Sequence, residues 1–237
     1  DGQEIAVTYK GPVEGLPDIR YTNGGVFAGW YTEQFGNGIQ LVNGETVYNV
    51  SSLEIYDATR FSLIFEYTDG SYGDCPDQMS VIYGQTIGDD SVGRALPAPQ
   101  MDGWNFVGWF TADGSQLKDE DVYSAAGNLF VSTRWSKTVV YKDDTGSITG
   151  DQTEQTIYFG DEDMPLRDPG SFGDWTFGGW YTEQFGMGDK LENTSEIAEA
   201  DIELYAYWYI DGLTIYYYNA DNDSEVIGKL IYGKTVY

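Results

Sequence analysis

The 237-residue chain contains no histidine, one cysteine, and 12 Lys and Arg residues against 39 Asp and Glu. The absence of histidine removes the usual general base, the usual catalytic triads and most zinc or iron sites. Cys75 lies between Asp74 and Asp77, cannot form a disulfide within the chain, and is a poor candidate nucleophile. Paired carboxylates can hydrolyse glycosides, but acids this numerous form many accidental pairs. We therefore expect no enzymatic activity and no cofactor.

Basic residues are too few for several classes of partner. The net charge of −27 argues against nucleic acid, anionic membranes and sulfated glycans. No apolar stretch approaches the ~20 residues that span a bilayer, so we expect no membrane insertion. The acidic loops 161–163 and 221–225 raise the alternative of a bound cation, but Val226 stands where an EF-hand loop needs glycine. The charge is best interpreted as a soluble, self-repelling surface, and we assign no metal site.

One string of residues is repeated along the chain. Gly-Trp-Tyr-Thr-Glu-Gln-Phe-Gly occurs at 29–36 and again at 179–186, and a weaker copy lies at 106–111. The tryptophans of the three copies are roughly 75 residues apart, which is typical of a tandem repeat architecture. A unique active site would need residues outside this pattern. Fold and function therefore have to be interpreted for each repeat.

Short alternating apolar segments accompany each copy, separated by Gly, Asp and Asn clusters that predict turns. One kind precedes the tryptophan (5–9, 80–84 and 156–160), one closes the repeat (53–59, 129–135 and 202–208), and one opens the next (61–65, 138–141 and 213–217). Helical periodicity is limited to 195–200, with Asn193 or Thr194 as N-cap. The fold class predicted is mostly β, at most α+β, with short helices only.

The segments divide the chain into tandem repeats. We predict repeat 1 at 1–59, without its opening strand, repeat 2 at 60–136, repeat 3 at 137–210, and the opening hairpin of a fourth repeat at 211–237. This pattern favours a fragment of a longer array. Only a few residues separate each closing segment from the next opening segment, and none resembles a flexible linker. We therefore expect an elongated, semi-rigid rod near ~80 Å long.

The repeated aromatic motif has a structural and a functional interpretation. In a regular strand, Phe27, Gly29 and Tyr31 share one face, whereas Ala28 and Trp30 share the other. Gly29 would let a large neighbouring ring cross the strand. The structural interpretation places Phe27 in the core and Trp30 over the second face or the junction to the next repeat. The functional interpretation is a sugar-stacking platform made of Trp30, Tyr31, Trp109, Phe110, Trp180 and Tyr181.

The pattern Phe-x-Gly-Trp-Tyr-Thr, followed by Leu-Tyr-Ala-x-Trp, resembles the Listeria–Bacteroides repeat, also called the internalin B-repeat. The predicted third repeat matches best, at 177–182 and 204–208, and the Tyr-Gly element recurs at 81–84 and 230–233. The resemblance implies β-grasp-like (ubiquitin-like) modules with a mixed sheet. Such modules stand in tandem on secreted or wall-attached bacterial surface proteins, mostly adhesins. The family offers no catalytic residues to transfer.

Together these features predict a non-catalytic stalk or spacer that projects an adhesin from a bacterial cell surface. Its partners would be the neighbouring repeats of the parent protein. The alternative is an adhesive module that recognises a neutral glycan or a host protein through exposed Trp and Tyr side chains. The edge of residues 211–237 could also pair with repeat 1 of another molecule, which would form head-to-tail chains.

Overall fold

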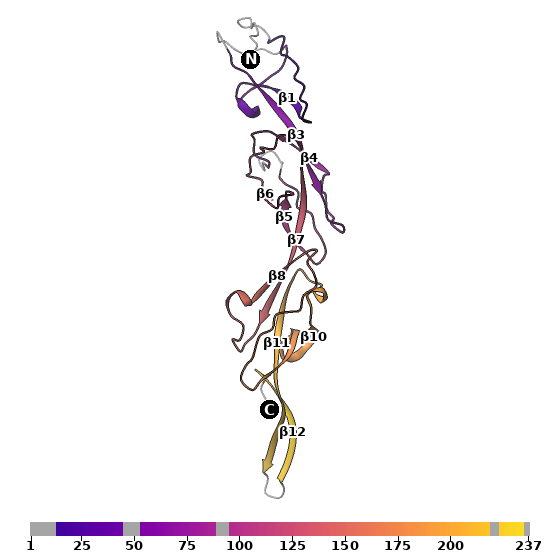
Figure 1. Ribbon diagram of the computed structural model, residues 1–237, viewed down its shortest axis with the longest axis vertical. Coiled ribbons are helices and arrows are strands. Elements are labelled where there is room, and N and C mark those ends of the chain that lie inside the picture. Colours follow the sequence, from indigo (N-terminus) through magenta and orange to yellow (C-terminus); the bar gives the residue numbers. More distant parts are fainter. Residues whose placement is uncertain (1–12, 45–52, 89–94, 219–222, 235–237) are drawn as a thin grey trace. The chain divides into compact units, whose positions relative to one another are not determined.

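A computed structural model describes residues 13–44, 53–88, 95–218 and 223–234 (Figure 1). The strands are β1 (Val26–Tyr31), β2 (Gln40–Leu41), β3 (Tyr56–Glu66), β4 (Gln78–Ile82), β5 (Asn105–Phe110), β6 (Gln116–Leu117), β7 (Leu129–Lys142), β8 (Glu154–Tyr158), β9 (Thr176–Glu183), β10 (Met187–Leu191), β11 (Asp201–Tyr218) and β12 (Asp223–Ile231). Single 3-10 turns lie at η1 (Gln34–Gly36), η3 (Gly150–Gln152), η4 (Gln184–Gly186) and η5 (Thr194–Glu196).

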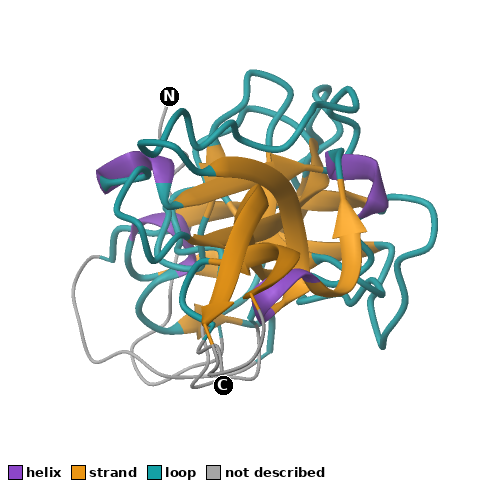
Figure 2. Ribbon diagram, turned by 90° about the horizontal axis from the view of Figure 1, so that it is seen from below, coloured by secondary structure: helices purple, strands orange, loops and turns teal. Residues whose placement is uncertain are grey.

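The predicted fold class is confirmed. Strands dominate the described residues, their pairing is both parallel and antiparallel, and each helical segment is one short turn (Figure 2). The helix expected at 195–200 is the 3-10 turn η5, and its N-cap Asn193 makes no side-chain cap bond. None of the helical turns in the described ranges is long or apolar enough to cross a bilayer. The β-grasp topology and the rod shape stay predictions.

The chain forms two compact units, which we describe separately. The first comprises residues 1–99 and 107–134, and the second comprises residues 100–106 and 135–237. In the first unit, β3 pairs antiparallel with β1 from Tyr56 to Arg60 and antiparallel with β4 from Arg60 to Ile64. From Leu63 onward it also pairs parallel with β7. The partner of β3 therefore changes at Arg60 without a break in the strand.

The second unit repeats this arrangement around β11. This strand pairs parallel with β7 over residues 201–205, antiparallel with β9 over 205–209, and antiparallel with β12 from Tyr209 onward. The closing and opening segments that the sequence predicts as separate strands are thus one continuous strand. In β3 no glycine or proline lies between residues 56 and 66 to end the strand, and buried residues recur at every second position from Phe61 to Phe65.

The expected side-chain alternation in the aromatic motif is wrong. The pairing of β1 with β3 shifts between Phe27 and Gly29, and Gly29 has a φ of 135°. This β-bulge places an extra residue in β1, which turns Phe27 and Trp30 to the same face, with ring centroids 5.7 Å apart. The corresponding rings of β9, Phe177 and Trp180, are 5.4 Å apart.

The neighbour of the bulge glycine also differs from expectation. A side chain on Gly29 would lie 2.5 Å from Nε2 of Gln40, and one on Gly108 would lie 2.5 Å from Nε2 of Gln116. The Gln116 amide donates to the Val107 carbonyl at 3.0 Å. The glutamine of the neighbouring strand therefore occupies most of the space that these glycines leave open, and at Gly29 the Tyr31 ring also approaches to 3.2 Å.

Each unit has an apolar core built from equivalent positions. In the second unit the buried cluster comprises Val139, Tyr141, Ile148, Ile157, Leu166, Trp180, Ile197 and Leu204. In the first unit the buried residues include Leu63, Phe65, Val81, Ile87, Trp109, Tyr123 and Val131. Burying one large apolar side chain stabilises a fold by about 1.5–3 kcal/mol, so these clusters provide the main favourable contribution to each unit.

Tyr123 makes the stability of the first unit dependent on pH. Its side chain is 1% exposed, its hydroxyl donates to the Gly127 carbonyl, and burial raises its pKa to about 12. A tyrosine in the unfolded chain ionises near pH ~10. Stability from the neutral phenol is therefore complete below that pH and is lost as the pH rises toward 12.

We expect the urea midpoint of the parent protein to fall more steeply between pH 10 and 12 than the urea midpoint of Tyr123→Phe. Unfolding is measured by circular dichroism. Tyr158→Phe, which alters a side chain 43% exposed, serves as the matched control and should behave like the parent. If the urea midpoints of all three proteins fell equally between pH 10 and 12, this would contradict the assignment of the pH dependence to Tyr123.

Candidate functional site

The three motif tryptophans make the same hydrogen bond. In each case the indole Nε1 donates to a main-chain carbonyl 12 or 13 residues upstream. The pairs are Trp30 with Pro17 at 2.8 Å, Trp109 with Pro97 at 2.7 Å, and Trp180 with Arg167 at 2.7 Å. The indole thus anchors the approach segment to the strand that carries the motif.

These indoles face the cores of the units. Trp109 is 1% exposed and Trp180 is 2% exposed, and Trp30 is half-buried. The ring of Trp109 lies 4.6 Å from that of Phe65, and the ring of Trp180 lies 4.6 Å from that of Tyr141. The buried indoles have no free face on which a sugar could stack. Ligand binding by the platform residues as a set stays a prediction.

The residue after the tryptophan is more accessible than the tryptophan in the second and third copies. Tyr31, Phe110 and Tyr181 are half-buried, because adjacent residues of a strand point to opposite faces. The guanidinium carbon of Arg134 lies 3.9 Å above the ring of Phe110. Tyr181 meets Tyr207 in an edge-on contact at 5.5 Å. Of the six platform residues, Trp109 and Trp180 are buried, whereas these three and Trp30 are half-buried.

A cluster of tyrosines extends this surface in the second unit. Tyr207 and Tyr209 of β11 stack at 5.4 Å, and the ammonium of Lys229 lies 3.4 Å from the Tyr209 ring centroid. Together with Tyr181 we call these residues the tyrosine cluster. The sequence did not indicate Tyr207 and Tyr209 as members of a ligand platform. Tyr207 lies in the predicted strand 202–208 and Tyr209 directly follows it, and residues two apart share a face where the strand continues.

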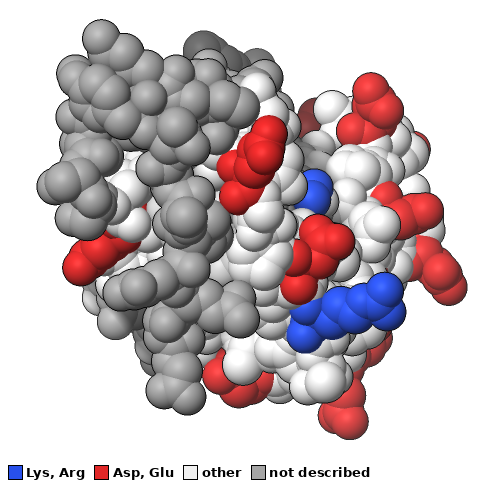
Figure 3. Space-filling model, turned by 90° about the horizontal axis from the view of Figure 1, so that it is seen from above, with Lys and Arg blue, Asp and Glu red and all other residues white. Residues whose placement is uncertain are grey.

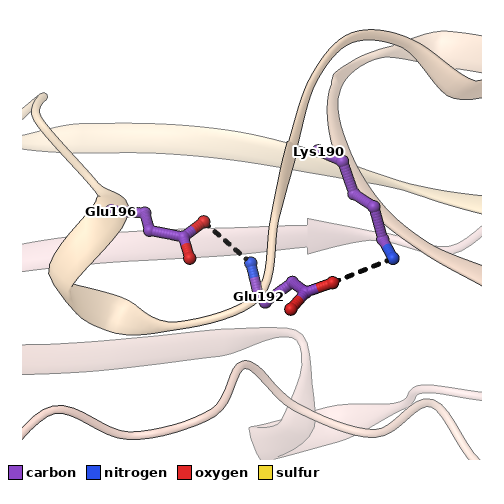
Figure 4. Close-up of polar contacts among 3 residues, drawn as sticks. All are labelled: Lys190, Glu192 and Glu196. Atoms are coloured by element: carbon purple, nitrogen blue, oxygen red, sulfur yellow. Dashed lines mark hydrogen bonds and ion pairs between the residues drawn. The ribbon is translucent and has the colours of Figure 1, made fainter.

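An open groove of about 330 Å³ lies beside Trp180. Its walls include Leu166, Arg167, Asp168, Phe177, Gly178, Gly179, Lys190, Leu191 and Glu192. Lys190 Nζ lies 3.1 Å from a carboxylate oxygen of Glu192, and this hydrogen bond raises the pKa of Lys190 (Figure 4). The carboxylate of Glu196 accepts from the Glu192 amide at 3.0 Å. Among the charged residues of the groove walls, Lys190 and Glu192 thus neutralise each other.

The acidic loop 161–163 uses its carboxylates to stabilise turns. Asp161 accepts from the Tyr158 amide, and Asp163 accepts from the Ser195 amide, each at 2.8 Å. The bond from Ser195 holds the pKa of Asp163 below its usual value. Within the described ranges, no three or more Asp, Glu or Cys residues gather into a metal-binding group. The acidic loop 221–225 begins outside the described residues.

Acidic side chains are dispersed over the surface. On the face drawn in Figure 3, Asp and Glu side chains are scattered among neutral residues, and Lys and Arg occupy few places. This distribution agrees with the excess of 39 acidic over 12 basic residues. Such a surface offers no basic footprint to a polyanion.

The chain belongs to the Listeria-Bacteroides repeat domain family, whose model matches residues 61–130 and 138–207. The two matches cover more than half of the chain and lie within the predicted second and third repeats. Two tandem copies are thus confirmed. The predicted first repeat, the start of a fourth and the proposed boundaries stay predictions.

Two relatives come from Evansella cellulosilytica. A protein named as a putative membrane protein is 23% identical over 190 residues, which cover 77% of this chain and 27% of the relative. A protein named as a putative Gly-rich membrane protein is 28% identical over 169 residues, which cover 64% of this chain and 19% of the relative. The chain thus spans a small part of each relative. No solved structure matches it.

The indole hydrogen bond can be tested at Trp180. We expect Trp180→Phe to lower the local stability of the second unit by about 1–3 kcal/mol, because it leaves the Arg167 carbonyl without its buried donor. Hydrogen exchange of the β9 amides, measured by mass spectrometry, should accelerate roughly tenfold or more. The matched control is Tyr158→Phe, which changes an exposed side chain of the second unit, with an expected effect below about 0.5 kcal/mol. Equal exchange rates in the two variants would contradict the anchoring role.

Proposed function

We propose that this chain is a semi-rigid stalk segment of a bacterial cell-surface protein and spaces an adhesin domain from the cell. The observation that carries the proposal is the continuity of β3 and β11. Each strand contains the closing segment of one predicted repeat and the opening segment of the next. Successive repeats therefore share a strand where flexible modules have a linker.

The backbone hydrogen bonds around these strands oppose bending. The Tyr83 amide donates to the Thr59 carbonyl at 2.9 Å, at the point where β3 changes partners. The Tyr232 amide donates to the Trp208 carbonyl at 3.0 Å in the equivalent position of β11. A sharp bend would break such bonds, each of which contributes about 0.5–1.5 kcal/mol. A restricted angle between successive repeats is the expected consequence.

The cell-surface location is supported by the comparisons and the charge. The two relatives from Evansella cellulosilytica carry names that refer to membrane proteins. The family consists of repeat domains, and this chain bears a net charge of −27. A strongly acidic surface resists self-association. These properties suit an extracellular spacer of a secreted or wall-attached protein.

Small-angle scattering tests the stalk. A compact protein of 237 residues would have a radius of gyration near ~18 Å. We expect a value clearly above this, with a maximum dimension of ~80 Å or more, because repeats of ~25–30 Å follow one another in line. A radius close to ~18 Å would contradict the stalk. A concentration series of the same samples tests the head-to-tail pairing expected of residues 211–237.

The tyrosine cluster favours a second candidate function, an adhesive module for a neutral glycan or a host protein. Tyr181, Tyr207 and Tyr209 offer adjoining aromatic surface, and Lys229 beside them can donate hydrogen bonds. Tyrosine combines an apolar ring with a hydroxyl, which suits a ligand with both apolar faces and polar edges. The nearby groove would add polar contacts.

A binding panel of neutral glycans, acidic glycans, mucin and matrix proteins tests this alternative at physiological salt. Were the chain adhesive, Tyr181→Ala should weaken binding of the neutral ligands about tenfold, since one stacked ring contributes on the order of 1–3 kcal/mol. The matched control Tyr158→Ala removes an exposed ring of β8 outside the cluster and should leave the affinity unchanged. Absence of saturable binding across the panel would exclude the panel's ligands and leave the stalk as the sole proposal.

A further inference from the structure

Two phenylalanines have an unusual backbone conformation. Phe35 in η1 has a φ of 60° and Phe185 in η4 has a φ of 63°, and in the part of the chain that the structure describes no other residue except glycine has a positive φ. The left-handed conformation costs a residue with a side chain roughly 1–2 kcal/mol. Such strain persists where surrounding contacts enforce it, and it often marks a functional contact.

The contact that holds Phe35 comes from the following repeat. A side chain on Gly84 would have its Cβ only 2.3 Å from Cγ of Phe35, so the phenyl ring occupies the space that this glycine leaves open. Gly84 lies two residues after the end of β4, in the opening hairpin of predicted repeat 2. The ring of Tyr83 lies 6.0 Å from the ring of Phe35. Phe35 of predicted repeat 1 thus sits on the Tyr-Gly turn of the next repeat.

Backbone hydrogen bonds hold the Tyr-Gly turn that Phe35 contacts. The Tyr83 amide donates to the Thr59 carbonyl at 2.9 Å, and the Gly84 amide donates to the Tyr123 carbonyl at 2.8 Å. Both bonds fix the turn within the first unit. The equivalent pair in the second unit is Phe185 with Gly233, where a Cβ on the glycine would lie 3.4 Å from the ring. The contact therefore recurs, more loosely, at the second copy of the motif.

The middle copy of the motif lacks this contact and has another. Residues 111–114 form a tight turn closed by a hydrogen bond from the Gly114 amide to the Thr111 carbonyl, with no Gln-Phe-Gly. Gly160, which corresponds to Gly84, has nothing within 4 Å of its Cβ position. In its place the ring of Trp104 meets Phe159 at 5.1 Å.

The ring that Trp104 provides is absent from predicted repeat 1. Trp104 precedes the motif phenylalanine by two residues, and Trp175 stands at the same place in predicted repeat 3, where it meets Tyr232 at 5.3 Å. Gly25 occupies this position in predicted repeat 1. Phe35 is therefore the aromatic contact that this repeat offers to the Tyr-Gly turn of the next.

We propose that the Gln-Phe-Gly turn is a latch that docks on the Tyr-Gly turn of the following repeat and fixes the angle between them. The proposal rests on the stalk function and names the contact that stiffens it. The left-handed backbone of Phe35 directs its ring toward the next repeat. The ring packs in the space where Gly84 has no side chain. At a repeat without Gln-Phe-Gly, the Trp104 ring fixes the equivalent position.

Spin-label distance measurements on the full chain test the latch. The labels are placed at Asp18→Cys and Glu120→Cys in a Cys75→Ser background, so that they report on predicted repeats 1 and 2. We expect Gly84→Ala to broaden the distance distribution about twofold, because a junction without its ring contact samples several orientations. The parent distribution should be narrow.

The matched control is Gly160→Ala. Gly160 has a φ of 90° against 84° for Gly84, so alanine meets similar backbone strain, but no ring lies within 4 Å. Labels at Glu120→Cys and Asp189→Cys report on predicted repeats 2 and 3, and their distribution should be unchanged by Gly160→Ala. Equal broadening by both alanine substitutions would assign the effect to backbone strain and overturn the latch.

Phe35→Gly separates the latch from folding, because it removes the ring and relieves the left-handed strain. We expect the same broadening as for Gly84→Ala, with circular dichroism and the thermal midpoint preserved. A narrow parent distribution that Phe35→Gly leaves narrow would overturn the latch and leave the stalk standing. A parent distribution already as broad as that of the variants would overturn both.

Discussion

The constraint on which the structure depends is that one continuous strand contains the closing segment of one predicted repeat and the opening segment of the next. The closing half of β3 pairs with β1, its opening half pairs with β4, and the partner changes at Arg60 with no intervening residue. A repeat that borrows a neighbour's strand to complete its own sheet cannot be detached without exposing backbone groups. Tandem repetition is therefore part of the fold, and the absence of a linker follows from it.

Within each repeat, a bulge and one hydrogen bond organise the core. The bulge glycine, Gly29 or its equivalents, turns the motif phenylalanine and tryptophan to the same face. The indole N–H then anchors an upstream carbonyl in all three copies. A buried indole whose N–H is satisfied adds apolar area without an unpaired donor. These rings stabilise the repeat, and the residues that follow Trp109 and Trp180 are more exposed than the tryptophans themselves.

The repeats share a core but differ in the contacts at their junctions. Phe35 reaches the next repeat in one case, Trp104 does so in another, and Trp175 and Phe185 both contribute in the third. Core positions tolerate little variation, because the closely packed interior accepts few changes of volume. Junction rings are less constrained. In the stalk that we propose, different junction rings would give the junctions different stiffness.

The sequence by itself determined the repeat, its spacing and its mostly β character, because the exact copies of the motif and the period-two alternation record them directly. It also placed most strands, including residues 129–135 and 138–141, which β7 joins into one. It did not reveal the bulge at Gly29, because the expected alternation assumes a regular strand. An extra residue in a strand is recognised only by comparison with the partner strand.

Only the tertiary structure decided which surfaces remain free. The sequence left Trp180 open as core or platform, and the structure buries its ring, because packing against Tyr141 and the bond to the Arg167 carbonyl both come from residues distant in the chain. The contact of Phe35 with Gly84 could not be predicted from the sequence either. A side chain's conformation can be expected from its own residue type, but the neighbour that holds it is known only once the strands are paired.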